Sequence, residues 1–281
     1  MEVINALSFD VEDWYHPELV REVVKDPHSQ IMESTQPIID LLDRYRIKAS
    51  FFVVGEIAEQ NPGLVETIFL KGHEIGCHGY SHKPLWALNE SLFRRELELF
   101  HSVMERILGK VKIKGFRAPT FSLDDRTQWA LKVLRDFGYQ YDASLFPARI
   151  NPLYGVRGVP ARPYHICLED LRKEDSRSPL IEFPLPLLTL GRLRVPISGG
   201  FYLRVFPLPF LSWGLRRINR DQPFLLYFHP WEGYTRTPRQ KLPLYNRLIS
   251  YYGTRFSLRK VESLLQRFKF GRVDEVLGLT G

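Results

Sequence analysis

Residues 71–85, KGHEIGCHGYSHKPL, place a short apolar stretch directly before two histidines, His78 and His82. Imidazoles four residues apart can point at one position in space, and a metal ion is the ligand that most often occupies it. The spacing alone is weak evidence, because chance and packing also produce such pairs. The prediction of a metal site therefore depends on whether the rest of the chain supplies a third ligand, a base and an acid.

Short apolar strands alternate with helices on both sides of this stretch. The expected strands are residues 3–9, 48–54, 74–77, 111–116 and 224–228, with further short strands at 181–184 and 192–196. The expected helices are residues 36–45, 57–71, 91–108, 125–137, 209–218 and 257–268. This alternation predicts a parallel sheet with helices packed outside it, and hence an α/β fold.

The chain has 281 residues, of which 44% are hydrophobic, and no segment reads as a linker, so we expect a single domain over residues 1–281. Prolines are dense between residues 146 and 200, where we expect an irregular insertion, and residues 236–281 are expected to form a helical extension. Cys77 and Cys167 lie far apart, which argues against a disulfide framework or a thiolate metal cluster. Cys77 is interpreted as a small buried residue.

Residues 1–14 lack the basic and apolar segments of a signal peptide, and no run of about 18 apolar residues predicts a membrane span. We therefore expect a cytoplasmic protein. The formal net charge is +7, with much of the excess after residue 192. No nucleic-acid-binding motif accompanies this charge, so nucleic acid is not an expected partner. The basic, aromatic-rich segment 201–217 predicts a peripheral contact with anionic lipid at the inner membrane or with a pyrophosphate-linked substrate.

Polar residues follow the predicted strands at their carboxyl ends. The set comprises Asp10, Glu12, Asp13, His78, His82, Arg117, Asp142 and His229. Each has an ordinary structural explanation, such as a turn or a surface ion pair. These ordinary explanations do not account for the fact that all of these residues lie at the ends of separate strands. In a parallel α/β barrel these ends meet at the face where active sites form.

The set is also chemically coherent. One carboxylate and two imidazoles have the composition of a catalytic zinc site with open positions. A metal in such a site lowers the pKa of water and polarises a carbonyl group. A second carboxylate could then take a proton from water, and a histidine across the pocket could protonate the leaving group. Arg117 would hold the base ionised and oriented.

At these residues the chain resembles the metal-dependent polysaccharide deacetylases, the nodulation-deacetylase homology group of carbohydrate esterase family 4. The matching motifs, in chain order, are SFDVED at residues 8–13, HGYSH at 78–82, RAP at 117–119 and LYFH at 226–229. Order and spacing agree over about residues 3–232. The resemblance implies a distorted (β/α) barrel with about seven parallel strands.

The resemblance also implies a role for each motif. Asp10 is expected to be the catalytic base and His229 the catalytic acid, while Arg117 tethers Asp10. Pro119 is expected to lie beside a backbone amide that binds the developing oxyanion. Asp142 is expected to support His229.

His78 and His82 are the expected ligands of a divalent metal, most often zinc in this family, with cobalt, nickel or manganese as alternatives. Many relatives have two adjacent aspartates at the third ligand position, whereas Val11 follows Asp10 here. The carboxylate ligand is therefore Glu12 or Asp13. Alternation of side chains along the strand favours Glu12, whereas a bend at the strand end would favour Asp13.

The implied reaction is hydrolytic removal of N-acetyl groups from an amino-sugar polysaccharide or its lipid-linked precursor. Within the family, the chain is similar to a subgroup associated with bacterial exopolysaccharide gene clusters, which shares DVEDW, FRAPTFS, SGGFYLR and FHPWE. We therefore expect a role in exopolysaccharide or cell-surface glycan biosynthesis. Trp14, Tyr15, Trp231 and Tyr202 are candidate platforms for sugar rings, with an ordinary core role as the alternative.

Three other functions remain open. A hydrolase of the same fold could act on another C–N bond, such as that of a cyclic ureide, although such relatives tend to lose the histidine pair. A non-catalytic carbohydrate-binding relative would tolerate the loss of Asp10 or His229, yet both are present. A nucleotide-sugar transferase could use residues 10–13 as an acidic motif, but the histidine pair would then have no role.

Overall fold

The computed structural model describes residues 3–149, 154–191 and 193–280. Seven parallel strands form its centre, in the order β11-β1-β2-β3-β4-β5-β8. Their bounds are β1 (Ile4–Val11), β2 (Ser50–Val53), β3 (Glu74–Cys77), β4 (Gly115–Phe116), β5 (Tyr141–Asp142), β8 (Ile181–Glu182) and β11 (Leu225–Phe228). The predicted α/β class and the predicted number of parallel strands are confirmed.

Further strands extend this sheet on both sides. An antiparallel pair, β6 (Tyr164–Cys167) and β7 (Asp170–Glu174), continues it beyond β8, and β12 (Lys269–Gly271) pairs with β1 in parallel. A separate antiparallel ribbon is formed by β9 (Leu187–Leu190) and β10 (Leu193–Pro196). Among the described residues, no strand pairing joins β8 to β11, so backbone hydrogen bonds do not close the expected barrel.

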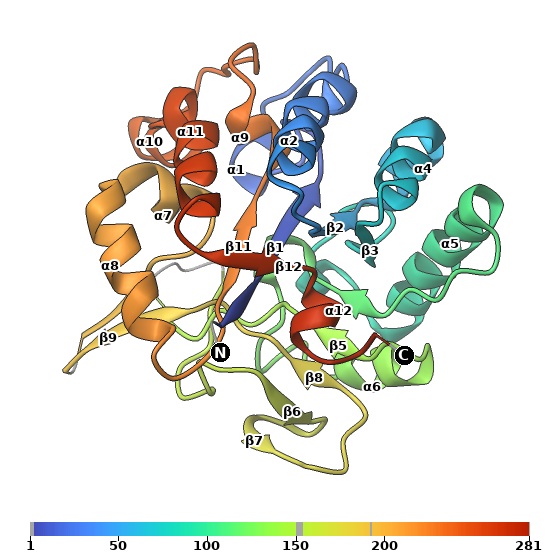
Figure 1. Ribbon diagram of the computed structural model, residues 1–281. Helices are drawn as coiled ribbons and strands as arrows, with labels where there is room; N and C mark the ends of the chain where they lie inside the picture. The colour runs from blue at the N-terminus through green and yellow to red at the C-terminus, as the bar shows by residue number, and fades with distance from the viewer. Residues whose placement is uncertain (1–2, 150–153, 192, 281) are drawn as a thin grey trace.

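Helices cover the outside of the sheet (Figure 1). Those that follow strands in the first half are α2 (Ile31–Tyr45), α3 (Gly55–Gln60), α4 (Pro62–Leu70), α5 (Glu90–Leu108) and α6 (Ala130–Asp136). Those of the second half are α7 (Gly200–Val205), α8 (Leu208–Ile218), α9 (Pro230–Gly233), α10 (Leu244–Tyr251), α11 (Thr254–Leu265) and α12 (Val273–Val276). A one-turn helix, α1 (Glu18–Arg21), and two 3₁₀ turns, η1 (Leu85–Ala87) and η2 (Pro119–Phe121), complete the set. No helix in the described part of the chain is long and apolar enough to cross a bilayer.

The helix expected from residue 36, with Pro37 in its first turn, begins at Ile31, so Pro37 lies in the second turn. The start is not visible locally, because the Gln30 side chain makes no cap hydrogen bond. Instead the carboxylate of Asp13, from the strand end seventeen residues earlier, accepts a hydrogen bond from the Gln30 amide at 3.0 Å. A helix terminus needs such an acceptor, and here a tertiary contact supplies it.

The segment expected to be an irregular insertion, residues 146–200, contributes directly to the sheet. It contains β8, which pairs with β5 in parallel, as well as the β6–β7 pair and the β9–β10 ribbon. Residues 150–153 and 192 of this segment lie outside the described residues. The helical extension expected over residues 236–281 likewise adds β12 to the sheet. The single-domain boundary remains a prediction.

A buried polar network fixes the C-terminal segment at the end of the sheet opposite α10 and α11 (Figure 1). Glu74, at the start of β3, accepts hydrogen bonds from the hydroxyl of Tyr141 (2.9 Å) and the amide of Asp274 (3.2 Å), and it contacts the Ser50 hydroxyl. Burial and the neighbouring Asp274 carboxylate raise the pKa of Glu74 to about 7. This network lies at the amino end of β3. The carboxyl ends of the parallel strands lie at the opposite end of the sheet, and the network does not cover them.

Candidate metal centre and active site

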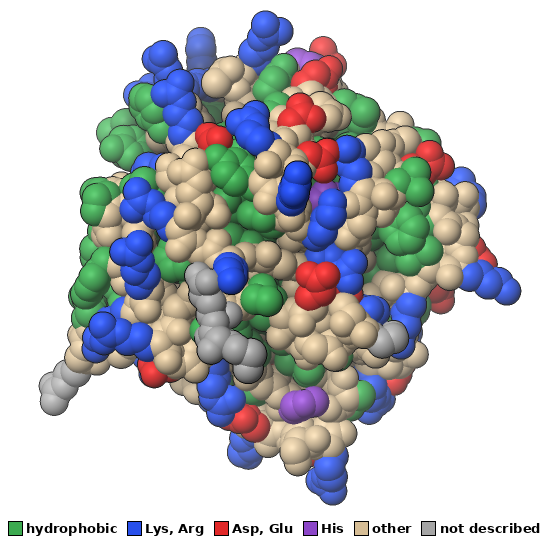
Figure 2. All heavy atoms as spheres, viewed as in Figure 1, with side chains coloured by type: hydrophobic (Ala, Val, Ile, Leu, Met, Phe, Trp, Pro, Cys, Tyr) green, Lys and Arg blue, Asp and Glu red, His purple; other side chains and the backbone are tan. Residues whose placement is uncertain are grey.

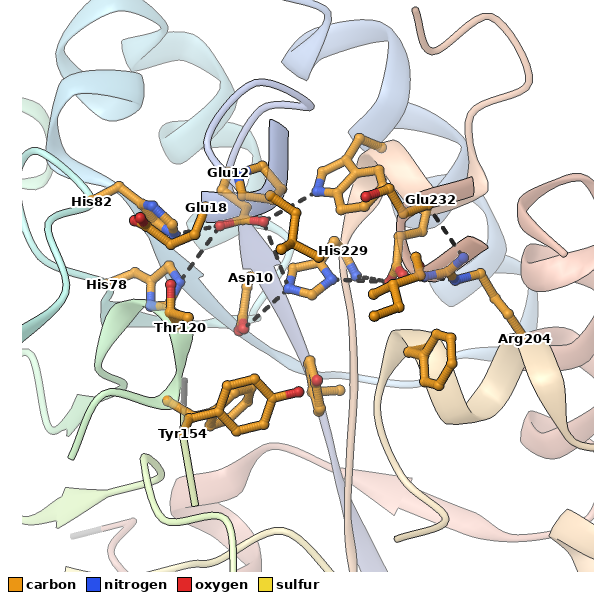
Figure 3. A pocket seen from close by; sticks show the side chains of 18 residues that line it. Asp10, Glu12, Glu18, His78, His82, Thr120, Tyr154, Arg204, His229 and Glu232 are labelled. Atoms are coloured by element: carbon orange, nitrogen blue, oxygen red, sulfur yellow. Dashed lines mark hydrogen bonds and ion pairs between the residues drawn. The ribbon is translucent and has the colours of Figure 1, made fainter. Parts of the chain in front are cut away.

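Three potential metal ligands meet at the carboxyl ends of β1 and β3 (Figure 3). Glu12 follows the last residue of β1, His78 follows β3, and His82 lies in the loop after it. One ligand atom from each residue lies within 4.8 Å of the other two, and all three side chains are buried. This is the group that the parallel register of β1, β2 and β3 predicts, because strand ends meet at one edge.

The orientation of His78 is fixed by the backbone of the neighbouring strand. Its Nδ1 lies 2.8 Å from the carbonyl oxygen of Arg117, which makes Nδ1 the protonated nitrogen. Its Nε2 therefore carries the lone pair and lies 4.0 Å from Glu12 Oε2. Burial lowers the pKa of His78 to about 4, which keeps the ring neutral and able to bind a metal.

His82 is held by a strained loop. Its φ is +52°, a conformation that costs energy for any residue other than glycine, and Gly79 in the same loop has a φ of +72°. Glu96 of α5 fixes this loop, because its carboxylate accepts hydrogen bonds from the amides of Tyr80 (3.0 Å) and Ser81 (2.7 Å) and from the Ser81 hydroxyl (2.7 Å). The two histidines are therefore positioned by a loop that Glu96 holds in place, and not by the face of a helix.

The residues present fit a divalent metal. His82 Nε2 contacts Glu12 Oε2, yet neither ring nitrogen of His82 makes a hydrogen bond of good geometry to the described residues. Native proteins rarely bury a polar atom without a partner, and a metal ion at His82 Nε2 would satisfy this one. A carboxylate and two imidazoles with further space beside them is also the donor set that catalytic zinc sites use.

The structure separates the two carboxylates between which the sequence did not decide. Asp13 turns away from the histidines and accepts hydrogen bonds from the amides of Trp14 (2.9 Å) and Gln30 (3.0 Å). Glu12 lies between His82 and His229 and accepts a hydrogen bond from Trp231 Nε1 at 3.1 Å. Burial alone would raise the pKa of Glu12, but the histidines His82 and His229 lower it. The geometry favours Glu12 as the third ligand.

Asp10 and Arg117 form a buried ion pair beside this group. Arg117 is fully buried, and its Nη1 donates to Asp10 Oδ1 at 2.5 Å and to the Ser8 hydroxyl at 3.0 Å. Its Nε donates to the carbonyl of Ala143 at 3.1 Å, and its guanidinium lies over the Phe52 ring, 4.1 Å from the centroid. These contacts fix the Asp10 carboxylate, whose Oδ2 lies 3.8 Å from His229 Nε2.

His229 faces Asp10 and Glu12 from the end of β11. Its Nε2 lies 3.7 Å from Glu12 Oε1, and the Trp231 ring stacks on the imidazole with centroids 5.6 Å apart. Burial alone would lower the pKa of His229, but the carboxylates of Glu12 and Glu232 raise it to about 9. At neutral pH the ring therefore carries a proton on Nε2, which points toward Asp10 and Glu12.

Sequence reasoning missed the two residues that orient His229. Glu232 Oε2 lies 2.9 Å from His229 Nδ1, and the other oxygen, Oε1, pairs with Arg204 Nε at 2.8 Å (Figure 3). In the sequence HPWE, His229 is the N-cap residue of a helix and Glu232 lies three residues after it. A glutamate at this position is typical of helix N-termini, so the sequence did contain a signal for Glu232. No local signal marks Arg204. Gly200 leaves room for this pair, because a Cβ at position 200 would overlap the Glu232 carboxylate.

The expectation that Asp142 supports His229 is wrong, because Glu232 occupies that place. Asp142 instead accepts a hydrogen bond from the Ser144 hydroxyl and lies beside Glu182, and burial raises the pKa of both carboxyls. The Ser144 hydroxyl in turn accepts from the Ala118 amide at 2.8 Å. Asp142 therefore supports the backbone next to Arg117, through Ser144, rather than His229.

The remaining predicted residues differ in how close they lie to the pocket. Trp231 lines it, whereas Trp14 is 2% exposed and donates from Nε1 to the carbonyl of His28, so its place is in the core and not on a sugar-binding surface. Pro119 packs near the Gly79 loop and begins the turn that contains Thr120, which has a φ of +58° and lines the pocket. Non-glycine residues in this conformation are concentrated at functional sites.

Both halves of the chain line this pocket. Its walls combine the site residues with Pro17, Glu18, Leu19, Thr120, Phe121, Tyr154, Phe201, Arg204, Tyr227, Ile249 and Ser250. Residues after 142 thus supply the side that faces the three candidate ligands (Figure 3).

Comparison with known proteins gives a family for the half that carries the candidate ligands. Over 100 residues the chain is 36% identical to a peptidoglycan-N-acetylglucosamine deacetylase of Bacillus cereus, a match that covers 35% of this chain and 36% of that one. The chain thus spans little more than a third of the length of that curated relative.

Two solved structures share the fold across nearly the whole chain. A peptidoglycan N-acetylglucosamine deacetylase superposes with a TM-score of 0.51 at 18% identity, covering 98% of this chain and 88% of that one. An allantoinase superposes with a TM-score of 0.61 at 14% identity, covering 99% and 90%.

Two family models divide the chain between them. Residues 143–278, which supply Arg204, His229 and Glu232, match a domain of unknown function, DUF3473. The model described as polysaccharide deacetylase matches residues 6–141, which contain Asp10, Glu12, the histidine pair and Arg117. Residues 6–141 of this chain therefore belong to the polysaccharide deacetylase family.

Proposed function

We propose that the protein is a metal-dependent hydrolase that removes N-acetyl groups from an amino-sugar glycan. The observation that carries the proposal is one pocket in which a Glu12–His78–His82 group faces both the Asp10–Arg117 pair and a protonated His229. Deacetylation needs a base for water and an acid for the departing amine, and these groups supply both.

The roles follow from the geometry. A divalent metal held by Glu12, His78 and His82 would supply Lewis-acid polarisation of the acetamide carbonyl. Asp10, paired with Arg117, takes the proton of the attacking water. His229 gives its Nε2 proton to the amine nitrogen as the C–N bond breaks.

Glu232 and Arg204 keep His229 in the productive orientation. The hydrogen bond at Nδ1 leaves only Nε2 facing the substrate, and the Glu232 charge stabilises the imidazolium before the proton is transferred. Arg204 holds the Glu232 carboxylate in place, because it binds the second carboxylate oxygen.

The proposed substrate is an acetylated amino-sugar polysaccharide or its lipid-linked precursor, within bacterial exopolysaccharide or cell-surface glycan biosynthesis. The similarity to a peptidoglycan-N-acetylglucosamine deacetylase supports the sugar class. The shared sequence forms DVEDW, FRAPTFS and FHPWE support the exopolysaccharide assignment.

Acetate release from N-acetylglucosamine oligomers, measured with and without a chelator, tests this proposal. We expect chelation to abolish release and added Zn²⁺ or Co²⁺ to restore it. His78→Ala should lose both the metal, measured by elemental analysis, and the activity. His165→Ala, which removes a histidine whose Nδ1 bonds the Ser178 carbonyl far from the site, should keep both.

Two outcomes would contradict the proposal. Full acetate release by both His78→Ala and Asp10→Asn would exclude the mechanism. Hydrolysis of a cyclic ureide such as allantoin, without acetate release from any sugar, would assign the same site to another C–N bond.

A further inference from the structure

An exposed apolar face lies on the outer side of α10 and the start of α11. It consists of Leu244, Tyr245, Leu248, Tyr252 and Phe256, which are 48–66% exposed. Of the fifteen large apolar side chains exposed in the described part of the chain, these five fall within thirteen consecutive residues. Scattered single apolar residues need no explanation, but a contiguous cluster marks an interaction surface. We call these five residues the α10–α11 face.

Cations surround this face and acids are missing from it. Residues 233–261 contain no aspartate or glutamate. Six basic side chains of this segment are exposed, and none pairs with an acidic side chain that the structure describes. They are Arg236, Arg239, Lys241, Arg247, Arg255 and Arg259. Figure 2 shows Lys and Arg side chains gathered at the top of the molecule, over α10 and α11, with hydrophobic side chains among them.

The face adjoins the mouth of the catalytic pocket. Ile249 and Ser250 of α10 line the pocket, while Leu244, Tyr245 and Leu248 of the same short helix point outward. A second groove, lined by Lys241, Arg247, Leu248 and Tyr252 among others, runs along the outer side of α10. A body bound to the α10–α11 face would therefore lie next to the opening through which substrate enters.

The charge decides what kind of body fits. A second copy of this chain, docked through the same face about a twofold axis, would bring two sets of six unpaired cations together. An anionic bilayer neutralises them, and aromatic and leucine side chains within a basic rim are the composition of surfaces that insert at the headgroup level. We infer that the α10–α11 face docks the protein on an anionic lipid bilayer.

This inference places the membrane contact on the α10–α11 face and not on the segment that the sequence predicted. The sequence pointed to residues 201–217, but within that segment only Val205 and Trp213 are large apolar residues exposed to solvent. Phe201, Leu211 and Leu215 of the same segment face the pocket or the core instead.

Vesicle sedimentation of the full chain tests the inference without any substrate. The probes are vesicles of phosphatidylglycerol with phosphatidylcholine and vesicles of phosphatidylcholine alone. We expect binding to the anionic vesicles only, weakening as salt is raised. Each cation near such a surface strengthens binding by about fivefold, so Lys241→Glu with Arg247→Glu should weaken it by well over tenfold. Tyr245→Gln with Leu248→Gln should also weaken binding, but with a smaller change in salt dependence.

Matched variants on other surfaces serve as controls. Lys110→Glu with Lys112→Glu makes the same change in net charge in the loop before β4, and Leu70→Gln with Leu92→Gln removes two side chains that are 83% and 52% exposed. Both control variants should bind as the unmodified protein does. Unchanged melting temperatures would show that every variant is folded.

Three results would overturn the inference: no sedimentation with anionic vesicles, equal loss in the control variants, or self-association in solution that Tyr245→Gln with Leu248→Gln abolishes. The last result would assign the face to a second copy. None of them depends on whether the protein releases acetate.

Discussion

The two halves of the chain contribute to one pocket in different ways. Residues 6–141 place their functional groups directly at strand ends, where Asp10, His78 and Arg117 need only the parallel register to meet. The second half brings His229 to a strand end as well, but orients it through Glu232 on α9 and Arg204 on α7. The functional residues of the first half can therefore be recognised from sequence motifs. In the second half, the orientation of His229 depends on contacts between segments that are far apart in the sequence.

This difference separates binding from orientation. The first half has the candidate metal ligands and the proposed base, so we expect a change there to remove the metal or impair the attack of water. The second half has the proposed acid and its supports, so we expect a change there to leave the metal in place and slow the departure of the amine. Substitutions at Glu12, Glu232 and Glu96 test that division, and a fourth at Glu74 tests stability alone; the expected effects decrease from Glu12 to Glu74.

The largest effect is expected at Glu12. Glu12→Gln removes the carboxylate charge from the Glu12–His78–His82 group, and we expect metal affinity to fall by more than about 100-fold and acetate release to be lost. Asp13→Asn is the matched control, because Asp13 accepts the hydrogen bond at the start of α2 instead. It should keep the metal and change stability little, because asparagine caps a helix about as well as aspartate does. Metal titration and thermal melting measure both, and metal loss in Asp13→Asn alone would reverse the ligand assignment.

A smaller effect is expected at Glu232. Glu232→Gln removes the charge that helps to hold the pKa of His229 at about 9, so that pKa should fall. We expect kcat to decrease by about 100-fold with metal content unchanged, and the alkaline limb of the pH–rate profile to move to lower pH. A structural role alone would leave the position of that limb unchanged. Loss of metal in this variant would break the proposed division between the halves.

A still smaller effect is expected at Glu96, which clamps the loop between the two histidines. Glu96→Gln replaces an acceptor of two amide hydrogen bonds and one hydroxyl hydrogen bond by a weaker one. We expect metal affinity to fall by about tenfold, as for other residues that support ligands. Glu98→Gln, an exposed position on the same helix, is the control and should bind metal normally.

The last prediction concerns stability alone, at the opposite end of the sheet. The pKa of Glu74 is about 7 in the folded protein against 4.5 for an ordinary glutamate, so the folded state binds the proton more tightly. This contribution is fully present below pH 4.5 and is lost as pH rises toward 7, on the order of 3 kcal/mol. Urea denaturation across that range should show the loss, and Glu74→Gln should reduce it while Glu66→Gln, exposed on α4, should not. Equal pH profiles for all three proteins would contradict the assignment.

Much of the fold was readable because its strands are buried on both faces. Residues 224–228 are a continuous apolar run that contains β11, and β2 lies in residues 48–54, which are apolar apart from Lys48 and Ser50. The family resemblance narrowed the third metal ligand to Glu12 or Asp13, and the alternation of side chains along the strand favoured Glu12. The seventh strand, β8, has only two residues, but it lies within residues 181–184, which the sequence predicted as a short strand in spite of the surrounding prolines.

Of the two residues that orient His229, Glu232 carries a local signal in its spacing after His229, whereas Arg204 could not have been found from local pattern. Arg204 and Glu232 are 28 positions apart, and a buried arginine in an amphipathic helix has the same sequence appearance as an exposed one. Asp142 was misassigned because it lies at a strand end, which suggested a contact with His229. Its carboxylate instead accepts a hydrogen bond from the Ser144 hydroxyl. Motif position indicates which strand end a residue occupies, but not which neighbour its side chain meets.

The contacts of Arg204 limit how this protein can be divided. Besides Glu232, the guanidinium donates to the carbonyl oxygens of Ile249 and Tyr252, both at 2.6 Å. A chain truncated after the last motif, at about residue 233, would leave this buried cation without those acceptors and His229 with a poorly held partner. Residues 6–141 therefore cannot be expected to form the complete pocket by themselves, and a segment exchanged with a relative would have to include the sequence through at least residue 252.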